Sequence, residues 1–222
     1  MKGIDVSSYQ GDIDWAKVAA SGYSFVIVKA TQGAGVTDHN FRNNVTNANI
    51  SGLKVGAYHF CIIGSTPDIV SDAISEANYF DSALKSVSNL LTLPIVADIE
   101  TKSSSNTQEQ VLLYINTFFK TLSDLGYTNV ALYSNPSFLN ENLPAWHSLG
   151  DIKLWIAEYG VASPKIPNGW DKYWCWQNSQ SGIVNGVTGN VDTNFIPDVV
   201  LQPEITYINP PPETPTPNIP IF

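Results

Sequence analysis

Two acidic residues in the middle of the chain carry the clearest chemical signal of the sequence. Asp98 and Glu100 are separated by Ile99 and follow the apolar run 93–97. Side chains two residues apart on a strand point to the same side, so these carboxyl groups are expected to share one face. Neighbouring carboxyl groups in partly buried surroundings cannot both ionise easily, and the pKa of one of them rises. A carboxyl group that keeps its proton near neutral pH can act as the acid catalyst of glycosidic bond cleavage.

Two more acids are predicted to join this pair. Asp5 and Asp192 lie at the ends of the first and the last apolar runs that are typical of strands. In a β/α barrel the carboxyl ends of the strands meet on one active face, so all four acids are expected to converge there. An isolated Asp-x-Glu pair is more often a capping or ion-pairing feature than a catalytic one. Four acids gathered without a basic partner would be a poor structural choice, which favours the catalytic interpretation.

Other kinds of chemistry find little support in the sequence. The histidines His39, His59 and His147 lack the spacing of metal ligands. Cys61 and Cys175 form no Cys-x-x-Cys motif and are expected to be buried small hydrophobic side chains rather than a disulfide. No Gly-x-Ser-x-Gly nucleophile motif is present. The sequence therefore predicts an enzyme that uses no metal and no other cofactor.

Charge and hydropathy narrow the range of partners. The 222 residues include 11 basic and 20 acidic side chains, which gives a formal net charge of −9. Nucleic acid is not expected as a partner, because phosphate binding needs a basic surface. No apolar run approaches the roughly 18 residues of a membrane span, so no membrane insertion is expected. Met1 and Lys2 lead directly into a predicted core strand, and no signal peptide is expected.

Short apolar runs alternate with longer amphipathic stretches over most of the chain. The runs predict strands at 2–6, 24–30, 54–60, 93–98, 129–133, 153–157, 173–177 and 190–192. The amphipathic stretches predict helices at 14–20, 39–50, 67–87 and 107–125. Thr107 and Gln110 form a capping-box pattern at the start of the last of these helices, and Gly126 is expected to end it. After Tyr133 the connections are rich in proline and glycine, and no long helix is expected.

These elements predict an α/β fold, a parallel β/α barrel that begins as regular βα units and ends with strands joined by loops. Residues 1–202 are expected to form one catalytic domain. Residues 203–222 hold seven of the chain's 14 prolines and are expected to form an extended linker or tail. Linkers of this composition usually tether a second module, so a wall-binding module downstream of the linker is a possible partner.

Several motifs, in order along the chain, resemble those of glycoside hydrolase family 25, the Chalaropsis-type lysozymes. The matching segments are Gly3–Gly11 with Asp14-Trp15, Phe25–Gly33, Gly56–Phe60, Asp98–Glu100, Leu132–Asn135, Leu154–Ala157, Trp176-Gln177 and Val191–Asn194. The resemblance covers roughly residues 2–197. It implies an irregular TIM-like barrel of five βα units followed by three strands with loop connections.

The resemblance also implies an activity and a role for each acid. The activity is hydrolysis of the β-1,4 bond between N-acetylmuramic acid and N-acetylglucosamine in bacterial peptidoglycan. Glu100 takes the position of the family's acid/base, and Asp98 that of the acid which supports the reacting centre. Asp5 and Asp192 take the positions of the family's opening and late acids. Whether the enzyme is retaining, inverting or substrate-assisted stays open at this stage.

Aromatic residues near the predicted strand ends are candidates to bind the substrate. Tyr58, Tyr133, Trp155 and Trp176 could stack on sugar rings, with Tyr58 and Tyr133 the preferred pair. Gln177 is a candidate polar contact. Each aromatic residue alone is equally suited to the hydrophobic core.

Two rival functions and two biological settings remain open from the sequence. The first rival is a chitinase-like glycosidase, although the run 93–97 lacks the upstream acids that such enzymes usually carry. The second is a sugar-binding module of the cell wall that does not cut. The missing signal peptide and the tail fit the catalytic domain of a phage endolysin, released from the host cytoplasm to the wall. A secreted bacterial autolysin is the alternative.

Overall fold

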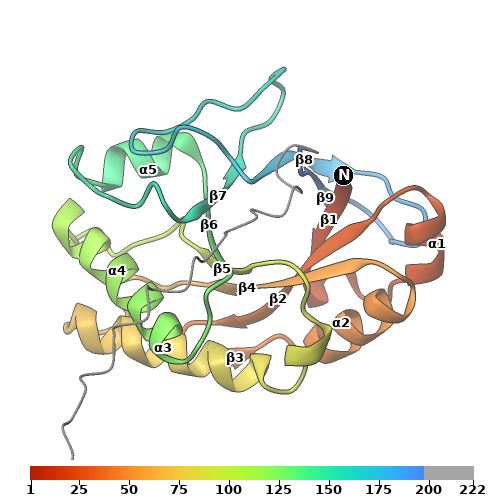
Figure 1. The fold of residues 1–222 in the computed structure, drawn as a ribbon, viewed down its shortest axis with the longest axis horizontal. Helices are drawn as coiled ribbons and strands as arrows, with labels where there is room; N and C mark the ends of the chain where they lie inside the picture. Colours follow the sequence, from red (N-terminus) through yellow and green to blue (C-terminus); the bar gives the residue numbers. More distant parts are fainter. Residues whose placement is uncertain (198–222) are drawn as a thin grey trace, which may run out of the picture.

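The structure, a computed structural model, describes residues 1–197 as a barrel of eight strands with one extra hairpin strand (Figure 1). The barrel strands are β1 (Lys2–Val6), β2 (Phe25–Gln32), β4 (Lys54–Phe60), β5 (Ile95–Asp98), β6 (Val130–Ser134), β7 (Lys153–Ala157), β8 (Cys175–Gly182) and β9 (Val191–Phe195). Strand β1 pairs with both β2 and β9, which closes the barrel. The short strand β3 (Val36–Thr37) pairs with the end of β2. The predicted linker 203–222 lies outside the described residues.

Five helices follow the first barrel strands in turn. They are α1 (Trp15–Ala20), α2 (Phe41–Ile50), α3 (Ile69–Leu84), α4 (Gln108–Asp124) and α5 (Pro136–Asn142). Single-turn 3-10 helices occur at η1 (Ser8–Gln10) and η2 (Ser88–Leu90). No helix connects β7, β8 and β9, so the prediction of five βα units followed by three strands with loop connections is confirmed. Within residues 1–197, no helix is both long and apolar enough to cross a membrane.

Local signals set the limits of the helices. The Thr107 side chain accepts a hydrogen bond from the Gln110 backbone at 3.3 Å, and the Gln110 side chain accepts one from the Thr107 backbone at 2.9 Å. This is the capping box that the sequence predicts. Gly126 has a φ of 95° just after the end of α4. Glycine has no Cβ, so it adopts this left-handed conformation without strain and ends the helix.

Alternation along the strands separates an outer core from an inner one. Val26 and Val28 of β2 point outward and pack beneath the helices, whereas Phe25 and Ile27 point into the barrel. Figure 1 shows α3 and α4 side by side on the outside of the barrel, where they contact one another. Apolar side chains fill the barrel interior, which is therefore a packed plug rather than a pore. Towards the carboxyl ends of the parallel strands the inward-facing side chains become polar.

The last strand departs from the prediction of a parallel barrel. Strand β9 runs antiparallel to both of its neighbours, β8 and β1. Only residues 183–190 connect β8 to β9. A parallel connection needs a crossover of about a dozen residues or more, so a link this short gives an antiparallel pair. The prediction of a wholly parallel barrel was therefore wrong at this strand.

Candidate active site

Strand β5 delivers two acids to the mouth of the barrel. Asp98 is the last residue of β5 and is 6% exposed. Ile99 is fully buried in the outer core, which turns the next residue, Glu100, back towards the mouth. The Glu100 side chain is exposed and can be reached by a substrate. Within the described residues, Asp98 Oδ1 is buried without a hydrogen-bond partner.

Asp5 and Asp192 meet across the seam that closes the barrel. They are direct partners in the antiparallel register of β1 and β9. Asp192 is the second residue of β9, so it lies near the beginning of its strand and not at the end that the sequence predicts. Because β9 runs in the opposite direction, its beginning lies at the same mouth as the carboxyl ends of the other strands. Asp192 therefore lies at the mouth as expected, although it is near the beginning of its strand and not at the end.

One glutamine amide joins the acids to the aromatic residues. Gln177 Nε2 donates to Asp5 Oδ2 at 2.9 Å and to Asp192 Oδ2 at 3.3 Å. Gln177 Oε1 accepts from the Tyr133 hydroxyl at 2.9 Å and also from the Tyr159 hydroxyl. The two hydroxyl donors fix which end of the amide faces the acids. Sequence reasoning did not find Tyr159, although it lies two residues beyond the end of β7, in step with the inward-facing positions of that strand.

A second amide donates to the same oxygen of Asp5. Asn194 Nδ2 donates to Asp5 Oδ2 at 2.7 Å, and Asn194 Oδ1 accepts from Trp155 Nε1 at 2.8 Å. Asn194 was not predicted from the sequence as a residue of the site. It lies two residues after Asp192 on β9, so strand alternation places the two side chains on one face.

The surroundings raise the pKa of all four acids. Burial, followed by the charge of Asp192, raises the pKa of Asp5 from 3.8 to about 7 despite the two amide donors. Burial, followed by the charge of Glu100, raises the pKa of Asp98 well above its ordinary value. Burial is also the largest cause of the raised pKa values of Glu100 and Asp192. The mouth can therefore hold protons on carboxyl groups at pH values where exposed carboxyl groups have lost them.

One basic residue accompanies the acids. The charge of Lys29, on β2, lowers the pKa values of Asp98 and Glu100 and so opposes part of the effect of burial. Lys29 Nζ donates to Gln32 Oε1 at 2.7 Å and lies 5.0 Å from the centre of the Phe60 ring. Four acids without a basic partner were expected from the sequence, but the charge of Lys29, from another strand, acts on two of them.

The aromatic candidates occupy three different environments. Tyr58 is half-buried and faces the cleft at the barrel mouth. Tyr133 is 8% exposed and Trp155 is 2% exposed, and their ring centres are 4.5 Å apart. Trp155 therefore forms the floor beneath the site and has no free face for a sugar. Trp176 packs on the outer core, because its neighbours Cys175 and Gln177 point inward, so the structure does not bring it to the acids.

A cleft of about 380 Å³ opens beside the acids. Its lining residues are Asp5, Val6, Ser7, Tyr9, Gln10, Tyr58, Gln180, Asn190 and Asp192. They come from the end of β1, η1, β4, the end of β8 and the start of β9. A concave polar surface with convergent acids and an exposed carboxyl group beside it is suited to acid catalysis on a polyhydroxylated ligand.

A family model for the glycosyl hydrolases of family 25 matches residues 4–187, most of the chain. The chain belongs to this family. It is therefore a glycoside hydrolase of the lysozyme type, and the resemblance found in the sequence motifs is confirmed. The matched span contains Asp5, Asp98 and Glu100 and ends just before Asp192.

Relatives of the family 25 hydrolase cover most of its length. It is 35% identical over 201 residues to lysozyme M1 of Streptomyces globisporus, covering 87% of this chain and 67% of that protein. It is 32% identical over 210 residues to the autolytic lysozyme of Clostridium acetobutylicum, covering 95% of this chain but 60% of that protein. It is 29% identical over 208 residues to the N,O-diacetylmuramidase of a Chalaropsis species, covering 86% of this chain and 96% of that protein.

Solved structures share the fold of the family 25 hydrolase. The lysozyme of Streptomyces coelicolor superposes with a TM-score of 0.79 at 32% identity, covering 88% of this chain and 91% of that chain. The CTP1L endolysin superposes with a TM-score of 0.72 at 30% identity, covering 90% of this chain and 67% of that chain.

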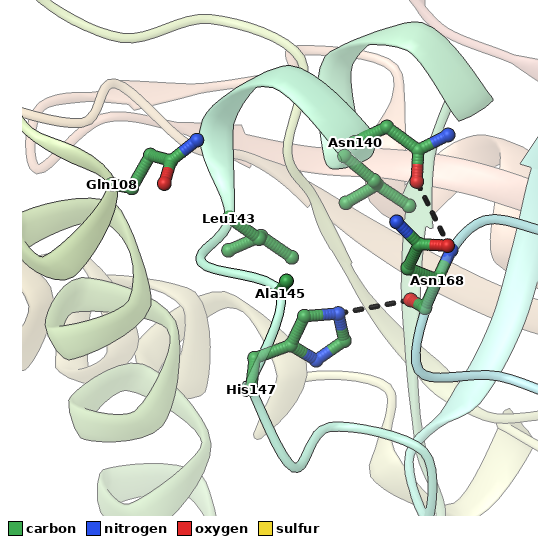
Figure 2. Close-up of a pocket in the computed structure, with 7 residues that line it drawn as sticks. Gln108, Asn140, Leu143, Ala145, His147 and Asn168 are labelled. Carbon is green, nitrogen blue, oxygen red and sulfur yellow. Dashed lines mark hydrogen bonds between the residues drawn. The ribbon is translucent and has the colours of Figure 1, made fainter.

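The family 25 hydrolase has another hollow, away from the acids. This hollow, of about 160 Å³, lies near α5 (Figure 2). Its lining residues are Gln108, Leu139, Asn140, Leu143, Ala145, His147 and Asn168. Figure 2 shows the Asn168 backbone hydrogen-bonded to His147 and to the Asn140 side chain. No carboxyl group lines it, so it lacks the means for acid catalysis.

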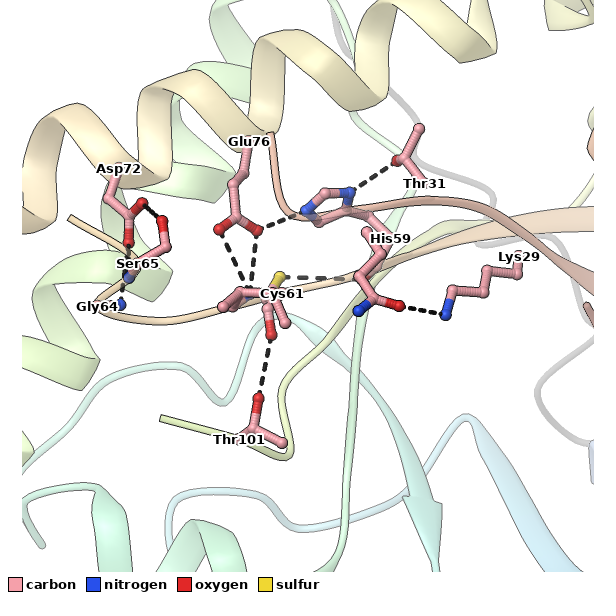
Figure 3. A network of polar contacts seen from close by, with 11 residues as sticks. Lys29, Thr31, His59, Cys61, Gly64, Ser65, Asp72, Glu76 and Thr101 are labelled. Atoms are coloured by element: carbon pink, nitrogen blue, oxygen red, sulfur yellow. Dashed lines mark hydrogen bonds and ion pairs between the residues drawn. The ribbon is translucent and has the colours of Figure 1, made fainter. Parts of the chain in front are cut away.

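A buried polar network of the family 25 hydrolase anchors α3 to the barrel (Figure 3). His59 Nε2 lies 2.7 Å from Glu76 Oε2, and His59 Nδ1 lies 2.7 Å from Thr31 Oγ1. The ligand atoms of His59, Cys61 and Glu76 all lie within 4.8 Å of one another, which makes them the residues best placed to hold a metal ion in the described part of the chain. Both imidazole nitrogens already have hydrogen-bond partners, so the network is satisfied without an ion. Burial lowers the pKa of His59.

The same network is hydrogen-bonded to the segment 98–101, which carries Asp98 and Glu100. Glu76 accepts hydrogen bonds from the backbone of Ile62 at 3.1 and 3.3 Å. The neighbouring Cys61 backbone N–H donates to the Asp98 carbonyl at 3.0 Å. The Thr101 hydroxyl donates to the Cys61 carbonyl at 3.4 Å. The loop after β4 therefore links helix α3 to the chain on both sides of Glu100.

Proposed function

We propose that this family 25 hydrolase is a muramidase in which Glu100 is the acid/base. It cleaves the β-1,4 bond between N-acetylmuramic acid and N-acetylglucosamine in bacterial cell walls. The family and its lysozyme and diacetylmuramidase relatives support this activity and favour neither rival function. The observation that carries the assignment of Glu100 is an exposed carboxyl group with a raised pKa, next to three other acids at the barrel mouth.

Glu100 protonates the leaving glycosidic oxygen in the first step. Its raised pKa keeps the proton available at higher pH than an ordinary carboxyl group would. After the bond breaks, the Glu100 carboxylate accepts a proton from the attacking water, and the acid is regenerated. Lys29 lowers the pKa of Glu100, which helps it to give up the proton.

Asp98 orients the reacting sugar by a hydrogen bond. The Asp98 side chain is 6% exposed, and its buried Oδ1 atom has no partner among the described residues, so it can accept a hydrogen bond from the substrate once the side chains around it move to admit the donor. The N–H of the 2-acetamido group is a donor of suitable chemistry. A hydrogen bond there would turn the acetamido oxygen towards the anomeric carbon, which favours the substrate-assisted route among the three left open.

Asp5 and Asp192 bind the substrate together. Gln177 donates to one oxygen of each, which holds the two carboxyl groups together. With the pKa of Asp5 raised to about 7 by burial and by Asp192, the pair retains a proton at mildly acidic pH. Such a pair offers both a donor and acceptors to sugar hydroxyls.

Substitution of the proposed acid tests the function directly. The Glu100→Gln variant should clear suspended cell walls at least about 100-fold more slowly than wild type, because general acid catalysis contributes about 10²–10⁴-fold. The exposed acid Glu141, on α5, offers the matched control Glu141→Gln. New reducing ends on N-acetylmuramic acid identify a muramidase, and N-acetylglucosamine ends would refute it. Cleavage of chitin in preference to walls would support the chitinase-like rival, and wall binding without clearing by wild type would support the non-cutting module.

The remaining proposals concern the setting of this domain. We propose residues 1–202 as the catalytic domain and 203–222 as a linker to a wall-binding module. The proline content of the linker supports this, as does coverage of 67% and 60% of the lengths of two relatives. Mass spectrometry of the mature protein would locate its carboxyl terminus. We favour a phage endolysin over a secreted autolysin, and a gene in a bacterial chromosome outside any prophage would refute that choice.

A further inference from the structure

The cleft beside the acids extends beyond the proposed reacting centre. Asp5, Asp192 and Tyr58 line the cleft, but Glu100 does not. The lining continues instead over η1 and over the ends of β8 and β9. A glycan strand bound at the acids could therefore continue along this cleft of about 380 Å³, past Asp5 and Asp192 to the part lined by η1.

Tyr9 stands at the edge of this cleft as an unusually exposed aromatic residue. Its relative exposure is 89%, the highest among the large hydrophobic residues in the described part of the chain. A single exposed aromatic residue is ordinary on a protein surface, so what distinguishes Tyr9 is its place in the lining of the cleft beside Asp5 and Asp192. Tyrosine combines an apolar face with a hydroxyl group, which suits contact with the apolar face and the hydroxyls of a sugar.

The turn that carries Tyr9 is rigid before any ligand binds. Its backbone N–H donates to Ser7 Oγ at 3.1 Å, and the Ser7 backbone donates to Gln10 Oε1 at 2.9 Å. The Ser8 backbone donates to the buried Asp38 at 2.8 Å. These contacts use backbone atoms around Tyr9 and leave its ring free. A platform fixed in advance loses little entropy when a ligand stacks on it.

Apart from Val6 and Tyr58, the rest of the lining is polar, and it lacks basic residues. Gln10, Gln180 and Asn190 supply side-chain amides from three separate segments. Amides can donate to and accept from sugar hydroxyls and acetamido groups. The only charged residues of the lining are Asp5 and Asp192, which disfavour a ligand that carries carboxylate or phosphate.

We propose that this cleft is a subsite for an uncharged N-acetylhexosamine unit of the glycan strand, with Tyr9 as its stacking platform. The inference rests on the proposed muramidase function, because it takes the ligand to be the same strand that Glu100 cleaves. Tyr9 binds a sugar that is not itself cleaved, so it sets the length of glycan that the enzyme uses best. It is a substrate-binding residue and takes no part in proton transfer.

Kinetics on peptide-free glycan fragments of increasing length test the subsite. Tyr9→Ala should lower kcat/KM on long fragments by about three- to tenfold, through a higher KM at nearly unchanged kcat. The shortest cleavable fragment should be hydrolysed at the wild-type rate. Tyr9→Phe, which keeps the ring, should retain most of the activity. Trp146, which is 70% exposed and is not part of the cleft lining, provides the control Trp146→Ala.

Binding in an inactive background separates this inference from the proposed function. Calorimetry of Glu100→Gln with a long peptide-free glycan should show weaker binding when Tyr9→Ala is added. This comparison of binding with and without Tyr9→Ala does not depend on cleavage, so it tests the subsite even if wild type is not a muramidase. Equal kcat/KM of Tyr9→Ala and wild type at every fragment length would overturn the subsite. A loss confined to peptide-bearing walls would also overturn it, because the cleft would then bind the stem peptide.

Discussion

Replacing Asp5 with asparagine should stabilise the protein at alkaline pH and inactivate it. Burial and Asp192 raise the pKa of Asp5 from 3.8 to about 7, so folding favours the protonated form. The stability from this group is fully present below its unfolded pKa and is lost as the pH rises through about 7. At about 1.4 kcal/mol for each pKa unit, the loss amounts to at most about 4 kcal/mol. Asparagine cannot ionise, and its carbonyl can still accept from Gln177 and Asn194, so Asp5→Asn avoids this loss.

Urea denaturation at several pH values between 4 and 8 measures the effect. The free energies of unfolding of Asp5→Asn and wild type should differ little at pH 4, should separate as the pH rises to about 7 and should then differ by a constant amount, with the variant the more stable. Asp12→Asn, which removes an exposed acid from the same end of the chain, serves as the control for net charge. Parallel curves for Asp5→Asn and wild type would refute the reasoning, because they would show that folding does not change the affinity of Asp5 for its proton.

Three further changes test other parts of the structure. Glu76→Ala should lower the free energy of unfolding by about 1–3 kcal/mol in chemical denaturation, because it leaves the buried His59 imidazole without its partner, and a loss below about 0.5 kcal/mol would contradict this. Lys29→Met should raise the pKa of Glu100, so the alkaline limb of the kcat/KM profile should move to higher pH; an unmoved limb would show that the charge does not reach the acid. Trp155→Phe removes the N–H that orients Asn194 and should cost about 1–3 kcal/mol of stability, as thermal unfolding would reveal.

The elements that the sequence predicts well are those fixed by local chemistry. The capping box of Thr107 and Gln110 depends on residues three positions apart, so it can be identified without the rest of the fold. The strands 2–6, 54–60 and 153–157 have the predicted limits, because their apolar runs begin and end sharply. Asp98 and Glu100 were expected to share a face; the outward, buried Ile99 between them and the effect of the Glu100 charge on Asp98 agree with that arrangement.

The parts that sequence reasoning missed depend on contacts between distant segments. The direction of β9 follows from its pairing with β1 and β8, although the short link 183–190 was a signal that could have been used. The basic partner Lys29 reaches the acids from another strand. Trp176 was proposed as a sugar contact without regard to the alternation of β8, which turns it away from Gln177. The amide of Asn194 matters only because Asp5 and Trp155 lie on either side of it.

The reversed final strand has a consequence for the order in which the enzyme becomes active. Strand β9 is the seam between the first and the last parts of the domain, and the Met1 amino group donates to the Ile196 carbonyl at 2.6 Å. A nascent chain that has not yet released this segment from the ribosome has an open sheet with an unpaired β1 edge, and it lacks Asp192. Catalytic competence should therefore arise only after β9 has emerged and paired with β1, so fragments that end before Val191 should fail to clear cell walls.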